Sequence, residues 1–263
     1  MKLFVFDVDR TLVHDGGEIS QPVRESIQRR LDMGDAIAIA SGRPFIGINK
    51  YLSLFKGRNR FAVGSNGAIL QDSSGNVLKR NGLEFKDLFS IRDEYPQIEK
   101  EGGAIYAYDK NGEVIALSRS IWTDDEVKYN EVSVNLIDEH SFPENEIILK
   151  VMVAASSSLI SSLQISKNDK KRYNIVKSDP RYLEFMNPLA DKTTGVLYLE
   201  EILGIKKEDI YTFGDEQNDL RMLEDFQGIA MGNAIDVCKE KAKFVTKTVY
   251  EDGIAYAFNE YIK

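Results

Sequence analysis

The chain has 263 residues, a formal net charge of −8 and a single cysteine. The negative charge argues against a nucleic-acid-binding protein, because such proteins neutralise phosphate backbones with clusters of Lys and Arg. One cysteine excludes an intramolecular disulfide, and no apolar stretch is long enough to cross a membrane. The first residues do not form a signal-peptide pattern, so we expect a cytoplasmic protein.

Short apolar runs alternate with helical patterns in the first 80 residues and again after residue 187. The runs that predict buried strands are 3–6, 36–40, 61–63, 210–213, 228–231 and 244–246. The patterns that predict helices cover 23–31, 44–55 and 193–203, and further helices begin near 218, 234 and 253. Strands that alternate with helices predict a Rossmann-like parallel sheet covered by helices.

The middle of the chain has a different pattern. The runs 104–108 and 114–117 flank an Asn-Gly pair, which is a strong signal for a hairpin. A long strand is predicted at 147–155, and a second hairpin is predicted from 173–177 and 182–186. We therefore expect an α/β fold with a catalytic core at 1–82 and 187–263 and an inserted α+β module at 83–186.

Acidic side chains follow two of the predicted core strands. Asp7 and Asp9 come after the first strand, and Asp215 and Asp219 come after the strand at 210–213. Ser41 and Gly42 follow the second strand, and Lys192 lies just before a predicted helix. Ligands of open α/β sheets bind beyond the carboxyl ends of the strands, so these residues are expected to converge on one site.

These residue types suit phosphoryl transfer. A carboxylate such as Asp7 can attack phosphorus and divide one displacement into two easier ones. Asp7, Asp215 and Asp219 could hold magnesium, which prefers oxygen ligands, and Ser41, the N–H groups after it and Lys192 could hold the phosphoryl group. Asp9, two residues beyond Asp7, is placed to act as a general acid and then as a general base.

Each of these signals is weak when it is taken alone. Acidic residues after strands often cap helices or bend turns, and an isolated lysine such as Lys192 is ordinarily a solvated surface residue. Cys238 is expected to be a structural or exposed thiol rather than a nucleophile. Trp122 in the insert could touch substrate but is at least as well explained by core packing. The combination of all the motifs in one order carries the functional prediction.

Four motifs resemble those of the haloacid dehalogenase-like superfamily. They are Asp7-Val8-Asp9-Arg10-Thr11-Leu12, Ser41-Gly42-Arg43, Lys192 and Gly214-Asp215-Glu216-Gln217-Asn218-Asp219. The stretches Ser65-Asn66-Gly67-Ala68 and Gly228-Ile229-Ala230-Met231-Gly232-Asn233-Ala234, with Lys241-Ala242 and Glu251-Asp252-Gly253, are similar to its Cof-type branch, which carries a large α/β cap. The resemblance covers both core segments strongly and the insert only by its position and size.

The resemblance implies specific roles. Asp7 would be the nucleophile and a metal ligand, and Asp9 would be the acid and base and would bind magnesium through its backbone carbonyl. Asp215 would be a metal ligand with Asp219 near it, and Asn218 would contact phosphate or order its loop. The superfamily usually has Gly where this chain has Arg10, so we expect an ordinary negative φ at Arg10, with its side chain pointing outward or toward the cap.

The resulting prediction is a magnesium-dependent phosphatase that acts on small phosphorylated metabolites, such as sugar phosphates or phosphorylated cofactors, through an aspartyl-phosphate. A phosphomutase of the same fold and a phospho-accepting signalling domain remain alternatives. Two acids at one strand end and a large insert both argue against the signalling domain. The oligomeric state and the precise substrate are left open by the sequence.

Overall fold

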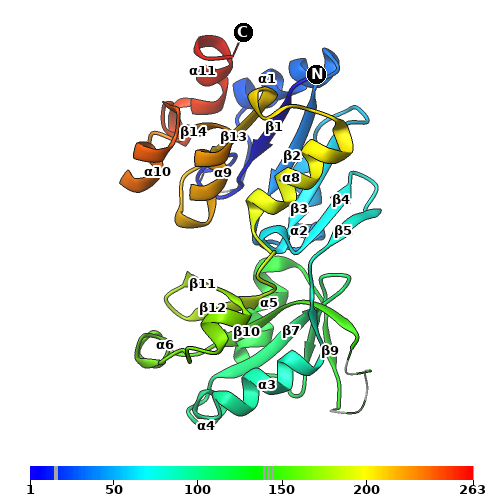
Figure 1. Cartoon of the computed structure of the whole chain (residues 1–263), viewed down its shortest axis with the longest axis vertical. Helices are drawn as coiled ribbons and strands as arrows, with labels where there is room; N and C mark the ends of the chain where they lie inside the picture. The colour runs from blue at the N-terminus through cyan, green and yellow to red at the C-terminus, as the bar shows by residue number, and fades with distance from the viewer. Residues whose placement is uncertain (15–16, 139, 141–142, 144, 263) are drawn as a thin grey trace. The chain divides into compact units, whose positions relative to one another are not determined.

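The computed structural model describes residues 1–14, 17–138, 140, 143 and 145–262. The chain forms two compact units, of which unit 1 comprises Met1–Lys79 and Asp191–Lys263 and unit 2 comprises Arg80–Ala190. In Figure 1 the blue-to-cyan and yellow-to-red parts of the chain form unit 1, and the green part forms unit 2. In the part of the chain that is described, no helix has the length and apolar character to span a membrane.

Unit 1 is built on a sheet with the strand order β15-β14-β13-β1-β2-β3-β4-β5. The pairs from β15 to β3 are parallel, and β4 is antiparallel to β3. The strands are β1 (Leu3–Phe6), β2 (Ala36–Ala40), β3 (Arg60–Gly64), β4 (Ile69–Asp72), β5 (Val77–Arg80), β13 (Ile210–Gly214), β14 (Gln227–Ala230) and β15 (Phe244–Val245).

Helices cover both faces of this sheet, which explains the continuous apolar runs of its central strands. In β1, Phe4 and Phe6 belong to one buried cluster and Leu3 and Val5 to another, as expected from the alternation of side chains along a strand. The helices of unit 1 are α1 (Gln21–Asp32), α2 (Phe45–Leu52), α8 (Lys192–Leu203), α9 (Leu220–Asp225), α10 (Asp236–Lys241) and α11 (Gly253–Glu260).

The register of the central strands sets the position of the residues that follow them. Phe6 at the end of β1 is aligned with Ile39 in β2 and with Phe213 in β13. The segments that follow all three strands therefore leave the same edge of the sheet. This edge of unit 1 carries the acidic and hydroxyl side chains singled out from the sequence.

Unit 2 contains a mixed sheet with the order β11-β12-β10-β7-β8-β9, and β6 also pairs with β10. Its strands are β6 (Leu83–Glu84), β7 (Ala104–Asp109), β8 (Val114–Ala116), β9 (Val134–Leu136), β10 (Ile147–Ala154), β11 (Asn174–Asp179) and β12 (Tyr182–Met186). Its helices are α3 (Lys86–Glu94), α4 (Gln97–Lys100), α5 (Ile121–Asn130), α6 (Ser157–Ser162) and α7 (Asp169–Arg172). The predicted fold class, a parallel-sheet core with an inserted α+β module, is confirmed.

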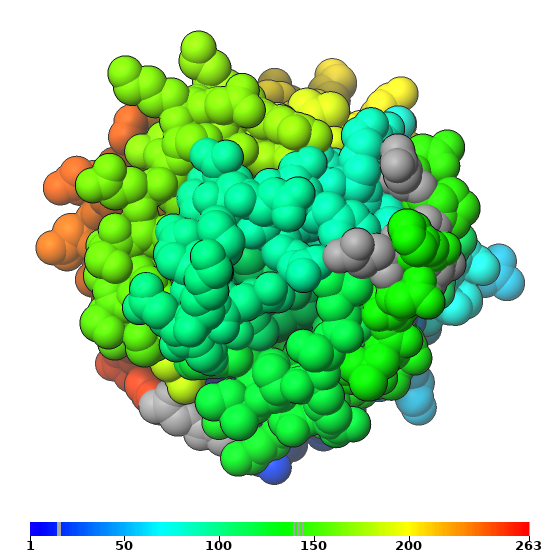
Figure 2. Space-filling model, turned by 90° about the horizontal axis from the view of Figure 1, so that it is seen from below, coloured from blue at the N-terminus to red at the C-terminus, as the bar shows by residue number. Residues whose placement is uncertain are grey.

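The two faces of the unit 2 sheet differ in polarity. Leu88, Ile91 and Ile98 from α3 and α4 pack with apolar residues of the strands, and in Figure 2 these two helices, blue-green in the colour scale, lie on the surface that faces the viewer. Tyr106 and Glu126 belong to a separate buried group, in which the phenol donates to the carboxylate over 2.6 Å. Unit 2 thus combines an apolar core with a buried polar cluster.

Candidate functional site

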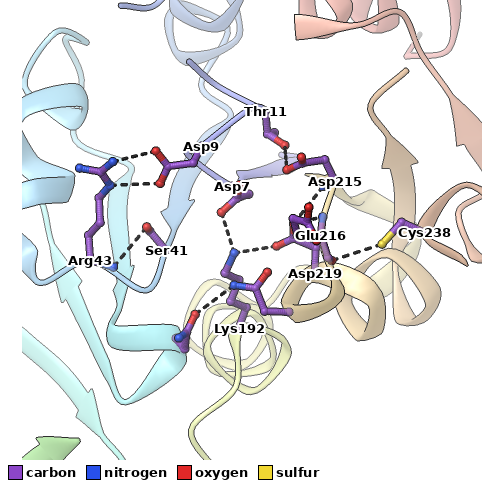
Figure 3. Close-up of polar contacts among 12 residues, drawn as sticks. Asp7, Asp9, Thr11, Ser41, Arg43, Lys192, Asp215, Glu216, Asp219 and Cys238 are labelled. Carbon is purple, nitrogen blue, oxygen red and sulfur yellow. Dashed lines mark hydrogen bonds and ion pairs between the residues drawn. The ribbon is translucent and has the colours of Figure 1, made fainter. Parts of the chain in front are cut away.

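Lys192 lies at the first turn of α8 and is buried between two carboxylates. Its ammonium Nζ is 2.6 Å from Asp7 Oδ1 and 2.7 Å from Asp219 Oδ1, and its side chain is 1% exposed. Figure 3 shows Lys192 between these two acids and, separately, Thr11 paired with Asp215. Burial disfavours the charged ammonium, but the charges of Asp219 and Asp7 outweigh this effect and raise the pKa of Lys192. Lys192 is therefore a fixed positive charge rather than a solvated surface lysine.

Asp219 is held by donors from its own loop as well as by Lys192. Its Oδ2 accepts the backbone N–H groups of Asp215, over 2.9 Å, and of Glu216, over 3.1 Å. Gly214 leaves room for this loop, because a Cβ at Gly214 would lie 2.5 Å from Asp219 Cβ. Asp219 thereby fixes both the loop after β13 and the orientation of Lys192.

Asp215 is fully buried, and only one of its carboxylate oxygens is hydrogen-bonded within the described part of the chain. Thr11 Oγ1 donates to Asp215 Oδ1 over 3.1 Å, whereas Oδ2 is buried without a hydrogen-bond partner there. Arg10 Nε lies 3.7 Å from that oxygen. Burial, with the charge of Asp219, raises the pKa of Asp215 to about 6. A buried acceptor in this position is costly unless something binds it.

The carboxylates of Asp7, Asp215 and Asp219 form a buried cluster with an excess of negative charge. One oxygen from each lies within 4.8 Å of the other two. If all three are ionised, Lys192 is the one buried positive charge beside them, and the half-exposed guanidinium of Arg10 lies 3.7 Å from Asp215 Oδ2. Burial, together with the neighbouring acids, raises the pKa of Asp7 although Lys192 opposes this shift. The donor set, its charge and the unsatisfied Asp215 oxygen fit a divalent cation that prefers oxygen ligands.

Asp9 projects away from this cluster and pairs with Arg43. The guanidinium of Arg43 donates from Nη2 to Asp9 Oδ1 over 2.7 Å and from Nε to Asp9 Oδ2 over 3.2 Å. Asp9 keeps a side-chain exposure of 60%. Arg43 also donates its backbone N–H to Ser41 Oγ over 3.2 Å, and Ser41 is buried. The Ser41-Gly42-Arg43 turn thus contacts the strand end that carries Asp7 and Asp9.

The expected backbone conformation of Arg10 was wrong. Arg10 has a φ of 62°, in the left-handed region that favours Gly. The tight turn after β1 requires this conformation, because Arg10 donates its N–H to Val13 O and the segment turns back on itself. The side chain does not point freely outward: its guanidinium donates to Glu216 Oε1 over 3.1 Å and to Asn233 O over 3.3 Å. These contacts lie within unit 1 and help to offset the free-energy cost of the positive φ at Arg10.

The strain at Arg10 leads to a prediction about two substitutions. Arg10→Gly and Arg10→Ala both remove the guanidinium and its half-exposed ion pairs, but only alanine keeps a Cβ at positive φ. We expect Arg10→Ala to have a free energy of unfolding about 1 kcal/mol lower than that of Arg10→Gly. Urea unfolding of the two variants measures this difference. Equal stabilities would show that the left-handed backbone at residue 10 is not strained.

The structure adds functional candidates to those assigned from the sequence. The motifs contain Thr11, Arg43 and Glu216, but the sequence assigns them no role. In the structure Thr11 contacts Asp215, Arg43 contacts Asp9, and Glu216 contacts Arg10. The sequence signal for them was only their place inside the motifs. Asn218, expected near phosphate, donates from Nδ2 to Asn66 Oδ1 over 3.3 Å. Cys238 is buried, as expected of a structural thiol, and its Sγ donates to Glu216 O over 3.2 Å.

Comparisons with known proteins cover nearly the whole chain. A family described as haloacid dehalogenase-like hydrolase matches residues 4–258. YxeH of Bacillus subtilis, named as a phosphatase, is 29% identical over 99% of this chain and 98% of its own length. The 5-amino-6-(5-phospho-D-ribitylamino)uracil phosphatase YwtE of the same organism is 25% identical over 99% of this chain and 98% of its own length. The crystal structure of TM0651 from Thermotoga maritima has a TM-score of 0.84 at 26% identity, covering 98% of this chain and 96% of that one.

Proposed function

The chain belongs to the haloacid dehalogenase-like hydrolase family, and from that premise we propose that it is a Cof-type phosphatase with a cap domain, which hydrolyses small phosphorylated metabolites through an aspartyl-phosphate on Asp7. Family membership and the enzyme class, a phosphoric monoester hydrolase, are confirmed predictions. The observation that carries the proposal is the placement of Asp7 at the end of β1, in contact with Lys192 and within one buried cluster with Asp215 and Asp219.

In the first step, an oxygen of Asp7 forms a bond to phosphorus while the bond from phosphorus to the ester oxygen breaks. The electron pair of that bond goes to the leaving oxygen, which takes a proton from Asp9. Lys192, Ser41 and the N–H of Gly42 are proposed to hold the phosphoryl oxygens, with Asn218 beside them. The burial of Lys192 and Ser41 supports this role, because fixed donors stabilise developing charge without having to reorganise.

In the second step, Asp9 takes a proton from water as the water oxygen bonds to phosphorus. The bond between phosphorus and Asp7 then breaks, which releases phosphate and restores the carboxylate. Both oxygens of Asp9 contact Arg43, so we expect one of these contacts to open when Asp9 carries the proton. Arg43 would then keep the acid at the strand end between the two steps.

Magnesium is the proposed cofactor. Asp7 and Asp215 are proposed to supply side-chain ligands and Asp9 its backbone carbonyl, while Asp219, which already accepts three hydrogen bonds, holds the loop next to the ion. When bound, the ion neutralises the carboxylates and the substrate phosphate, which would otherwise repel each other. The unsatisfied oxygen of Asp215 supports this assignment.

Removal of divalent metal tests the proposed function directly. We expect excess chelator to reduce hydrolysis of an aryl phosphate to background and added magnesium to restore it, because the buried carboxylates would otherwise repel the phosphate. Initial rates with chelator, with magnesium and with both at matched ionic strength give the comparison. Full activity in metal-free buffer would contradict the assignment of magnesium.

The acid role of Asp9 predicts a dependence on the leaving group. Asp9→Asn should reduce kcat/KM roughly 10²–10⁴-fold for alkyl phosphates, the range of a positioned proton transfer. The loss should be smaller for aryl phosphates, whose leaving groups need less protonation. Asp32→Asn, which changes an exposed acid near the end of α1, is the matched control and should leave both rates unchanged. An equal loss for aryl and alkyl esters would argue against Asp9 as the acid.

We further propose that residues 83–186 act as a cap that selects the substrate and that 1–82 with 187–263 supply the chemistry. The name of YwtE makes 5-amino-6-(5-phospho-D-ribitylamino)uracil one compound for a substrate panel, together with sugar phosphates and phosphorylated cofactors. A module that closes over a site and excludes water can contact the leaving group of the substrate and so discriminate among phosphate esters. Substitutions in 83–186 should therefore change the ranking of substrates more than the rate with a small aryl phosphate.

A further inference from the structure

Three consecutive residues after β3 have positive φ angles. Ser65, Asn66 and Gly67 have φ values of 48°, 52° and 92°, and all three are buried. Residues other than Gly rarely have positive φ angles. Such strained residues persist only where their surroundings hold them in place. The segment Ser65–Gly67, a 3₁₀ turn, must therefore be fixed by its contacts.

One set of contacts joins this segment to the turn after β2. Asn66 donates its backbone N–H to Ser41 O over 2.9 Å, and Ser65 donates its backbone N–H to Arg43 O over 3.0 Å. The side chain of Asn66 packs against Gly42, where an added Cβ would lie 3.2 Å from Asn66 Nδ2. The turn that carries Ser41 and Gly42 is thus held against Asn66 by both backbone and side chain.

A second set of contacts joins the same segment to the loop after β13 and to α8. Asn66 Oδ1 accepts a hydrogen bond from Asn218 Nδ2 over 3.3 Å. Gly67 lies so close to Asp191 that an added Cβ would be 2.0 Å from its carbonyl oxygen. Asp191 caps the N-terminus of α8 by accepting from the N–H of Thr194, and Lys192 follows it directly. All three loops that carry proposed phosphoryl-binding groups therefore meet at residues 65–67.

We propose that Asn66 is a positioning residue, which sets the spacing between the Ser41-Gly42 turn and Asn218 and so preorganises the site for the phosphoryl group. This inference rests on the proposed function, because it takes Ser41, Gly42 and Asn218 as phosphoryl-binding residues. Asparagine suits the position for two reasons. It tolerates the left-handed backbone better than most residues, and its amide oxygen accepts the hydrogen bond from Asn218.

Asn66→Gly separates this role from a purely structural one. Glycine accepts the positive φ without strain, so any loss of stability, measured by urea unfolding, comes from removing the buried side chain that packs against Gly42 and reaches Asn218. We expect kcat/KM to fall by roughly 10²-fold, the scale of a misplaced binding group. Inorganic phosphate, titrated calorimetrically in the presence of magnesium, should bind more weakly by a similar factor. Asp32→Asn, which changes an exposed acid outside residues 83–186, should change neither value.

The coupling between Asn66 and Asn218 decides the proposal. If Asn66 acts through Asn218, the double variant Asn66→Gly/Asn218→Ala should lose no more phosphate affinity than the weaker-binding single variant. Unchanged phosphate affinity in Asn66→Gly, or losses that multiply in the double variant, would overturn the assignment. If the wild-type protein hydrolyses no phosphate ester but the coupling in phosphate binding is seen, the proposed function fails and the role of Asn66 stands. Wild-type protein that binds no phosphate would overturn both.

Discussion

Replacing Asp7 by Asn should reduce phosphatase turnover on the order of 10⁴- to 10⁶-fold, the scale seen when a hydrolase loses its nucleophile. An amide has nearly the shape of a carboxylate but is a poor nucleophile, so the chemistry is lost while the packing is kept. Asp7 is buried, and burial raises the pKa of its carboxyl group. Because Lys192 keeps Asp219 as its ion-pair partner, the neutral amide should fold about as stably as the acid. Turnover of an aryl phosphate and urea unfolding of the same preparation measure the two effects.

Three outcomes of this experiment can be told apart. Loss of turnover with unchanged stability supports Asp7 as the nucleophile. Loss of both turnover and stability would mean that the variant is misfolded. The variant Asp9→Asn, at a less buried position, would then test whether turnover can be lost without unfolding. Turnover near the wild-type rate in a folded Asp7→Asn protein would contradict the mechanism, because a group other than Asp7 would then have to be the nucleophile.

Lys192→Met should have the largest effect on stability. It removes the ammonium that lies within 2.7 Å of both Asp7 and Asp219 and leaves two buried carboxylates without this partner. Breaking a buried ion pair from one side costs about 3–5 kcal/mol, and we expect a loss of this size in the free energy of unfolding near neutral pH. Lys206→Met changes an exposed lysine and should cost little.

The pH dependence of this loss has a definite sign. The folded protein raises the pKa of Lys192, so the stabilisation from its charge is fully present below the unfolded-state pKa, about 10.4, and is lost only as pH rises through the higher folded value. In the Lys192→Met variant, the carboxyl of Asp7, whose pKa is raised by burial, can take up a proton as pH falls, so the difference from wild type should shrink in acid. A difference that grows in acid, or a variant as stable as wild type at neutral pH, would contradict the ion-pair account.

The central strands of unit 1 were predicted well because strands that are buried on both faces form continuous apolar runs in the sequence. The runs 3–6 and 36–40 coincide with β1 and β2, whose side chains are buried on both faces. The helix α5 in unit 2 was not predicted. Its buried Glu126 accepts from Tyr106, which lies on another element, and its Ile121 is 71% exposed. A helix that buries a charged residue and exposes an apolar one lacks the amphipathic pattern from which a helix is predicted.

The acids, the serine and the lysine of the candidate site could be named from the sequence because each follows a strand or begins a helix. The details that depend on contacts between distant segments could not. The positive φ of Arg10 follows from a tight turn and from partners more than 200 residues away, Glu216 and Asn233. The place of Asn66 between Ser41 and Asn218 depends in the same way on three loops that meet only in the folded chain.

Chemical trapping of the intermediate tests the central claim most directly. Protein mixed with a rapidly hydrolysed aryl phosphate and magnesium is quenched in acid within a single turnover, digested and analysed by mass spectrometry. Asp9→Asn, which lacks the proposed base for the second step, should increase the amount of intermediate. The account predicts one phosphoryl group on the peptide that contains Asp7, and none in Asp7→Asn. A phosphoryl group on another residue would contradict it. Fast turnover without any covalent species in the wild-type protein or in Asp9→Asn would contradict it as well.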